Sequence, residues 1–456
     1  MLKTFANLFK IPELRVRIFF TIGLVAVARL LAMIPTPGVD WAALDALREA
    51  VEKNAGGGLV DWFDTFTGGA LTQCSIGTLS IWPYISAQIV IQLLTAVVPM
   101  LGRLQREGDA GRKTLTLYTR WLTIGICVFQ AAMLANTMLS PERLAEGVEG
   151  LVVMNPLLFY VSTIISMTGA SMFVMWLGDQ ITERGIGNGV SLLIMINISS
   201  RLPVAVADVA RRYFGAGGGQ VSGSIWELIL LLAFGFAVLL GTVALTQALR
   251  KIPIHSTRAI AKGVAYSGAQ QNYLPLRVNY AGVMPIIFAG PILQLIGLLG
   301  RLEGTSGVSR VLKQVGLTVG MPDTVTHIVL YAALILFFTF FWVATQFNAM
   351  NIADGLKRDG SYVPGVRPGM DTAEYLDGVM TRVTIIGALA LLAIAIIPLM
   401  LTASRNISWN IASFFGGTSL LIIVGVALDT IRQLESQLVM RNYDGFLKHG
   451  RIAGRR

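Results

Sequence analysis

The side chains that most often do chemistry in enzymes are few in this chain and far apart. The two cysteines, Cys74 and Cys127, have no CxxC or Cys/His spacing, so we expect ordinary packing residues rather than a zinc site or a disulfide framework. The histidines form no Ser/His, Cys/His or HExxH arrangement; they are His255, His327 and His449. We therefore predict that the protein is not an enzyme and has no catalytic residue, metal site or cofactor.

One glycine-rich segment, residues 185–189 with the sequence GIGNG, has the composition of a phosphate-binding loop. Such a loop would follow a strand and precede a Lys-Ser or Lys-Thr pair, and neither condition is met. The segment GGTS at 416–419 fails the same test. We interpret residues 185–189 as a tight glycine turn between two helices.

Polar side chains within apolar runs are the second kind of candidate. Arg29 lies inside the first run, where it either pairs within the protein or extends towards the membrane surface. No relay of acids or histidines, as a coupled pump needs, accompanies it. The uncharged polar residues either join helices or mark a seam that can open, and both interpretations stay open; they are Ser86, Gln88, Gln92, Asn188 and Ser191.

A membrane-embedded helical fold must position these residues. The 456 residues are 54% hydrophobic and 14% charged, whereas soluble domains carry about 25% charged residues. This composition excludes soluble domains, disorder, collagen and coiled coil. Because open sheets do not lie in lipid, we predict an all-α polytopic fold.

About ten apolar runs are long enough to cross a bilayer, which takes about 20 helical residues. The first run follows basic residues and lacks a small-residue cleavage site, so we expect a retained span. The expected spans are residues 18–35, 76–99, 115–139, 154–178, 190–206, 225–249, 280–299, 325–347, 383–401 and 411–428.

The basic residues set the expected orientation. With the N-terminus inside, about 25 of the 36 Lys and Arg residues lie on the cytoplasmic side, which places both termini in the cytoplasm. Three connections are long. The outer one, 35–75, turns apolar at 59–71, which predicts a half-helix folded back into the membrane or a loop docked on it. The inner ones, 250–279 and 348–382, are polar and rich in Gly and Pro.

Basic cytoplasmic loops and the lack of coupling acids favour a conduit over a pump or an enzyme. An ion-coupled secondary transporter with inverted repeats is the alternative that the composition allows.

Residues 176–189 read WLGDQITERGIGNG, and this segment resembles the turn between spans four and five of the SecY family of translocon channel subunits. Other segments resemble the family in the same order over nearly the whole chain. They are PTPG at 35–38, FTGGAL at 66–71, PYISA at 83–87, PLRVN at 275–279, AGVMP at 281–285, YVPGVRPG at 362–369 and FGGTSLLI at 415–422.

The resemblance implies two inversely related halves, 1–206 and 225–432, joined by an external connection at 207–224 and followed by a cytoplasmic tail at 433–456. It implies a re-entrant plug near 59–74 and an apolar ring that seals around a passing chain. The implied plug residues are Phe66, Gly68, Gly69 and Leu71, the ring residues are Ile81, Ile85, Val190, Ile194, Ile287 and Ile422, and the lateral gate residues are Gln92 and Asn188.

The implied function is passage of unfolded secretory polypeptides across the bacterial plasma membrane and lateral release of transmembrane helices into lipid. The implied partners are the small subunits SecE and SecG, the motor ATPase SecA, the ribosome, signal-bearing polypeptides and lipid. The implied docking residues are Arg367, Arg258, Lys262 and Arg358. Residues 254–263 carry only two charges where the family usually has a dense basic run, so we expect weaker electrostatic docking there.

Overall fold

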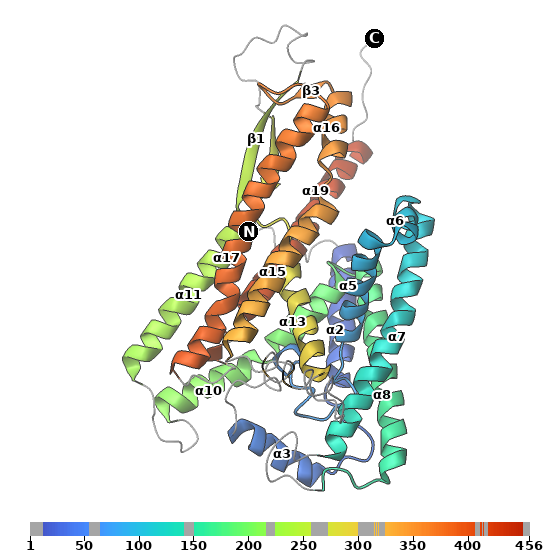
Figure 1. Cartoon of the computed structure of the whole chain (residues 1–456), viewed down its shortest axis with the longest axis vertical. Coiled ribbons are helices and arrows are strands. Elements are labelled where there is room, and N and C mark those ends of the chain that lie inside the picture. The colour runs from blue at the N-terminus through green and yellow to red at the C-terminus, as the bar shows by residue number, and fades with distance from the viewer. Residues whose placement is uncertain are drawn as a thin grey trace. The chain divides into compact units, whose positions relative to one another are not determined.

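The protein is described by a computed structural model and divides into two compact units (Figure 1). The first unit comprises residues 1–222, 408–411 and 422–456, and the second comprises 223–407 and 412–421. The structure describes residues 12–53, 64–140, 150–215, 224–256, 272–299, 324–405 and 418–449, with a few isolated positions between them.

The first unit is helical. α7 packs against α5 and α8, and α2 packs against α8 and α9. Its helices are α2 (Pro12–Leu31), α3 (Trp41–Lys53), α5 (Trp82–Val97), α6 (Pro99–Arg106), α7 (Asp109–Leu139), α8 (Pro156–Arg184), α9 (Gly189–Ser199), α10 (Leu202–Phe214) and the part of α19 (Thr418–His449) that begins at Ile422.

Proline and asparagine explain several helix ends in this unit. Proline occupies the first turn of α5, α6, α8 and α10, where its missing N–H costs nothing. Val98 precedes Pro99 and is therefore extended, so α5 and α6 meet at a bend of 105°. Asn155 and Asn188 cap α8 and α9 with their side-chain oxygens.

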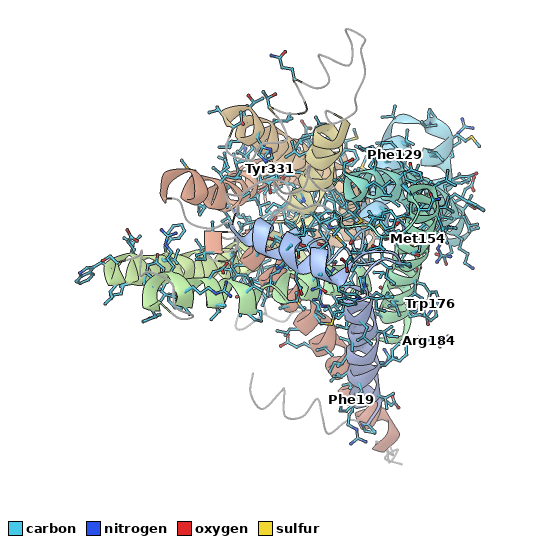
Figure 2. All side chains as sticks on the ribbon, turned by 90° about the horizontal axis from the view of Figure 1, so that it is seen from below. Phe19, Phe129, Met154, Trp176, Arg184 and Tyr331 are labelled. Atoms are coloured by element: carbon cyan, nitrogen blue, oxygen red, sulfur yellow. The ribbon has the colours of Figure 1, made fainter. Side chains whose placement is uncertain are left out.

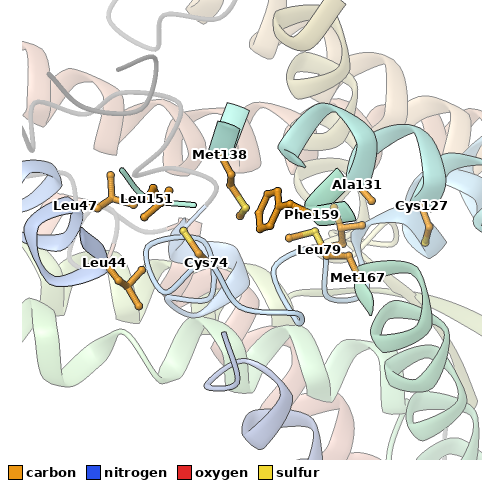
Figure 3. Packing of buried hydrophobic residues seen from close by; sticks show 10 residues of the cluster. All are labelled: Leu44, Leu47, Cys74, Leu79, Cys127, Ala131, Met138, Leu151, Phe159 and Met167. Atoms are coloured by element: carbon orange, nitrogen blue, oxygen red, sulfur yellow. The ribbon is translucent and has the colours of Figure 1, made fainter. Parts of the chain in front are cut away.

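Both cysteines lie in one apolar cluster of the first unit (Figure 3). The exposed fractions of Cys74 and Cys127 are 1% and 0%, and neither forms a disulfide. The cluster also contains Phe159 and Met167 of α8 and Leu44 of α3. The prediction that the cysteines are packing residues is confirmed.

The second unit combines helices with a small antiparallel sheet of order β2-β1-β3. In the register, Leu249 pairs with Arg277, and His255 pairs with Tyr362. The elements are α11 (Ile225–Gln247), β1 (Leu249–Ser256), β2 (Asn272–Arg277), α13 (Met284–Leu299), α15 (Val325–Gln346), α16 (Ala349–Arg358), β3 (Ser361–Tyr362) and α17 (Met370–Arg405). The strands fall within the two connections that we expected to lie outside the membrane, so the sheet adds to the all-α fold without contradicting it.

Six described helical segments are long and apolar enough to cross a membrane, and the bent pair α5 and α6 makes a seventh. The six are Asp109–Leu139, Pro156–Arg184, Gly189–Phe214, Ile225–Gln247, Val325–Arg358 and Met370–Ile397. Large apolar side chains such as Phe19, Phe129 and Trp176 are exposed on their helices (Figure 2), as expected for surfaces in contact with lipid. The multi-span helical class is confirmed, and the count of ten stays a prediction.

Candidate functional site

Residues 64–81 form a buried segment of the first unit that is mostly not helical. Only residues 64–67 form a helical turn, and most of the segment is shielded from solvent. A buried irregular backbone needs hydrogen-bond partners for its polar groups. The partners differ between the two ends of the segment.

The C-terminal part is held by the backbone that follows α2. The N–H of Ile76 donates to the carbonyl oxygen of Ile34 (2.9 Å), and the N–H of Thr36 donates to that of Cys74 (2.9 Å). The Thr36 hydroxyl donates to the same Cys74 oxygen (2.8 Å). This strand-like contact fixes residues 74–76 beside the end of α2.

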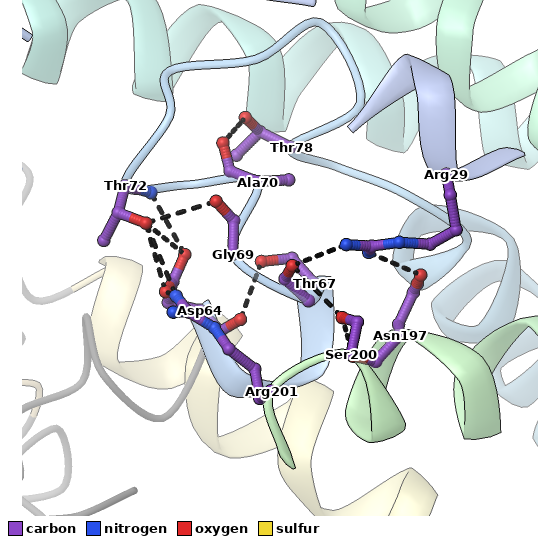
Figure 4. A network of polar contacts seen from close by, with 11 residues as sticks. Arg29, Asp64, Thr67, Gly69, Ala70, Thr72, Thr78, Asn197, Ser200 and Arg201 are labelled. Carbon is purple, nitrogen blue, oxygen red and sulfur yellow. Dashed lines mark hydrogen bonds and ion pairs between the residues drawn. The ribbon is translucent and has the colours of Figure 1, made fainter. Parts of the chain in front are cut away.

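The N-terminal part is held by side chains from other helices (Figure 4). Arg201, at the junction of α9 and α10, forms an ion pair with Asp64. Arg29 of α2 donates to the Gly68 carbonyl oxygen (3.1 Å), to which the Ser200 hydroxyl also donates (3.3 Å). Side chains from α2 and from the junction of α9 and α10 therefore hold one short turn.

The ion pair is buried and further hydrogen-bonded. The side chains of Asp64 and Arg201 are 4% and 17% exposed. The Asp64 carboxylate accepts the backbone N–H of Thr72 at 3.0 Å and the Thr72 hydroxyl at 3.3 Å. These donors compensate part of the cost of burying the carboxylate.

Gly68 and Gly69 allow the guanidinium groups to approach the backbone. Both have positive φ angles, +71° and +91°, which residues other than glycine rarely adopt. A Cβ on Gly68 would clash with Arg29 Nη1 and lie 2.8 Å from the Ser200 hydroxyl oxygen, and one on Gly69 would lie 3.2 Å from Arg201 Cζ. The glycine pair therefore has a local structural reason.

Apolar contacts complete the seat of this segment. The rings of Phe66 and Trp82 meet edge to face, with centroids 5.4 Å apart, and Leu71 is 8% exposed. All four expected plug residues thus lie in or next to this buried turn. Their role as a plug stays a prediction.

The expected ring residues are apolar and mostly buried, but they do not all lie in one unit. A Cβ added to Gly178 of α8 would lie 3.6 Å from the side chains of both Ile81 and Val190, so these two residues line the same side of Gly178. Ile85 and Ile194 are buried on α5 and α9, Ile422 is buried on α19 in the first unit, and Ile287 is buried on α13 in the second. The ring itself stays a prediction.

The two expected gate residues have different surroundings. Asn188 is exposed and caps α9 by accepting the N–H of Ser191 (3.2 Å). On α5, the side-chain oxygen Oε1 of Gln92 is buried and has no hydrogen-bond partner among the described residues. A buried acceptor without a hydrogen bond destabilises the state that buries it. A movement that brings a donor or water to the Gln92 oxygen would therefore be favourable.

Residues 185–189 form the predicted glycine turn between α8 and α9. Gly187 has φ +81°, and Gly189 packs so closely on the Gly178 carbonyl that a side chain would clash. The N–H of Gly189 donates to the Thr182 hydroxyl (2.9 Å), and that of Ile186 donates to Thr21 (3.2 Å). The turn thus serves helix packing.

Two of the expected docking residues are described. Arg367 is exposed in a loop shaped by turns at Pro364-Gly365 and Pro368-Gly369, and Arg358 is exposed in the last turn of α16. Arg258 and Lys262 lie outside the described residues.

The sequence analysis missed three polar residues that anchor the buried turn: Asp64 within the turn, and Arg201 and Asn197 outside it. The side chain of Asn197 accepts from Arg29 (3.4 Å) and donates to the Ser80 hydroxyl (2.9 Å). A usable signal was present, because Arg201 lies within an expected span and Asp64 lies within the apolar stretch expected to form the plug. A charge at membrane depth needs a partner.

These features define a multi-span helical membrane protein that holds a folded-back, polar-anchored segment among its helices. Among the described residues, no group of three or more His, Cys, Asp or Glu side chains could hold a metal ion.

The chain belongs to the SecY family, whose family model matches residues 75–431. It is 39% identical over 459 residues to the protein translocase subunit SecY of Thermotoga maritima, covering 100% of both chains. It is 40% identical over 447 residues to the same subunit of Vibrio cholerae, covering 97% of this chain and 96% of that one. The resemblance inferred from the motifs is confirmed.

Solved structures agree in fold. One described as a protein conducting channel gives a TM-score of 0.64 at 17% identity and covers 96% of this chain and 94% of its own. Sec61 in the canine ribosome-channel complex from the endoplasmic reticulum gives 0.61 at 16% identity, with the same coverage. The predicted helical fold is thereby confirmed. Membership of the SecY family, a family of translocase subunits, makes the chain a channel subunit and not an enzyme.

Proposed function

We propose that the protein is the central, protein-conducting subunit of a bacterial plasma-membrane translocon. It passes unfolded secretory polypeptides across the membrane and releases transmembrane helices sideways into lipid. The observation that supports this proposal most is the sequence identity of 39–40% to translocase subunits over nearly the full length of both chains.

The plug, ring and gate have separate tasks in this proposal. The turn at 64–72 blocks the channel when no substrate is present. The apolar ring seals around a moving chain without binding one sequence, since β-branched and aliphatic side chains offer no directional hydrogen bonds. Gln92 lies on the seam through which apolar helices leave, and its unpaired oxygen favours that opening.

Energy is supplied from outside the chain. SecA or the ribosome docks on the two polar connections, 250–279 and 348–382, with Arg367 and Arg358 among the contacts, and with Arg258 and Lys262 contributing less than a dense basic run. SecE and SecG are the small membrane partners. Both termini are cytoplasmic, which is supported by the distribution of Lys and Arg.

The experiment that tests the function is reconstitution in lipid vesicles with the small subunits and SecA. We expect ATP-dependent uptake of a signal-bearing polypeptide and no uptake of the same polypeptide without its signal. Ion-driven uptake of small solutes by the chain alone would instead indicate the secondary transporter.

The ring is tested by Ile422→Asn, which places an amide in a fully buried apolar position. A polar group favours water in a dry constriction, so we expect raised ion leak and export of substrates with defective signals. Unchanged leak and unchanged signal selectivity would show that Ile422 is not a ring residue.

A further inference from the structure

The buried segment formed by residues 64–81 is held at its two ends by different kinds of contact. Residues 74–76 share backbone hydrogen bonds with the chain after α2, whereas residues 64–69 are tied to other helices by side chains. Neighbouring backbone hydrogen bonds between two paired segments break together, whereas separate side-chain contacts can break one at a time. The N-terminal part can therefore leave while the C-terminal part stays.

The contacts at the N-terminal part are dominated by charge. The Asp64 carboxylate is paired with the guanidinium group of Arg201, and the guanidinium group of Arg29 binds the other side of the turn, at Gly68 (Figure 4). Arg29 has neutral partners, the Gly68 carbonyl and the Asn197 side chain. The turn thus supplies the carboxylate that pairs with Arg201 and the carbonyl oxygen that accepts a hydrogen bond from Arg29.

We propose that Asp64 and Arg201, supported by the bond from Arg29 to Gly68, form a clasp that sets how readily the plug leaves, and so how strong a signal sequence must be to open the channel. The clasp rests on the proposed function, because it assumes that residues 64–72 are the plug. It makes Asp64 and Arg201 specificity-determining residues for translocation.

The clasp stabilises the closed state selectively. A buried ion pair loses much when one partner is removed, because the remaining charge stays buried without compensation. Once the turn moves into water, both groups are hydrated and their attraction is small. Removing either partner therefore shifts the balance towards opening.

The two partners differ in the expected size of this shift. Arg201→Gln leaves a carboxylate that is 4% exposed with only the Thr72 donors. Asp64→Asn keeps an acceptor for Thr72 and for the guanidinium group. The charge that it leaves unpaired is that of Arg201, which is the more exposed of the two side chains. We expect Arg201→Gln to have the larger effect, and the double variant to be milder than the sum of the two.

The test measures plug position and signal selectivity in the full translocon. Thr67→Cys places a thiol in the turn, at a position that is 1% exposed, and labelling by a membrane-impermeant maleimide reports displacement. The parent chain, whose two cysteines are buried, gives the background. Export is measured in the same cells for a reporter with an intact signal and for one with a weakened signal.

We expect Arg201→Gln to raise the labelling rate at position 67 by at least about tenfold, the effect of about 1.4 kcal/mol, and to raise export of the weakened-signal reporter in parallel. The matched control is Arg120→Gln, which removes an exposed ion pair with Asp179 between α7 and α8 and should change neither readout. If Arg201→Gln does not accumulate, Arg201→Lys replaces it, because lysine keeps the charge but loses the planar donor geometry.

The clasp alone would be overturned if both clasp variants export the intact-signal reporter but show no change in labelling at position 67 and no change in export of the weakened-signal reporter. Failure of the unaltered chain to export the intact-signal reporter would overturn the proposed function itself. Additive effects of the two substitutions would also count against the clasp, since residues in one ion pair must be coupled.

Discussion

At the scale of single residues, Arg29 shows how far a sequence pattern reaches. Its position in an apolar run correctly predicted pairing within the protein as one of two outcomes. Its partners could not be predicted, because Gly68 and Asn197 are separated from it by 39 and 168 residues. Such contacts depend on how helices pack, and spacing along the chain does not encode them.

Gly68→Ala tests the glycine pair at this scale. A side chain at φ +71° costs about 1–2 kcal/mol, and the added methyl displaces Arg29 and Ser200 from the Gly68 carbonyl. We expect a severalfold rise in ion leak through vesicles that contain the purified channel. Gly125→Ala in α7 has open space around its Cβ and should leave the leak unchanged; equal leak in both variants would remove the structural reason given for Gly68.

At the scale of elements, local sequence predicted the turn between α8 and α9 well, because the glycine conformation that it needs is encoded in GIGNG itself. The sheet was missed. Its β3 strand has two residues, and it pairs with a partner about 100 positions earlier in the chain, so no local alternation marks it. The bend between α5 and α6 was missed as well, although Pro99 supplied a signal.

Gly189→Ala tests the packing of α9 on α8. Its Cβ would clash with the Gly178 carbonyl and lie 2.9 Å from the Ile181 Cβ, and such overpacking costs about 1–3 kcal/mol. We expect a lower thermal unfolding midpoint in detergent. Gly169→Ala, on an open part of α8, should raise the midpoint slightly or leave it unchanged; a similar fall in both variants would contradict this account of the turn.

Arg367→Glu tests the loop between β3 and α17. Its two Pro-Gly turns hold Arg367 exposed, so the substitution alters a surface charge and not the fold. We expect normal membrane insertion and a loss of SecA-driven export of tenfold or more, about 1.4 kcal/mol. Arg112→Glu reverses another exposed charge, near the start of α7, and should export normally. Normal export by Arg367→Glu would exclude Arg367 from docking.

At the scale of the whole molecule, composition predicted a membrane protein, and the motifs predicted its family. Seven of the expected spans coincide with described helical segments that are long and apolar enough to cross a membrane, when the bent pair is counted. The polar anchoring of the buried turn required the structure, since Asp64 and Arg201 come from segments with no shared pattern. Two inverted halves, with boundaries at 206 and 225, remain a prediction.

The central claim is that a translocating chain passes through the interior of the protein, past the apolar ring and the displaced plug. Its most direct test places a photoreactive residue singly at Ile85, Ile194 and Ile422, and at the exposed position Phe129 of α7, with a hydrophilic polypeptide halted during export. We predict strong crosslinks to the polypeptide from the three ring positions and none from Phe129. Crosslinking at the ring positions no stronger than at Phe129 would contradict the channel.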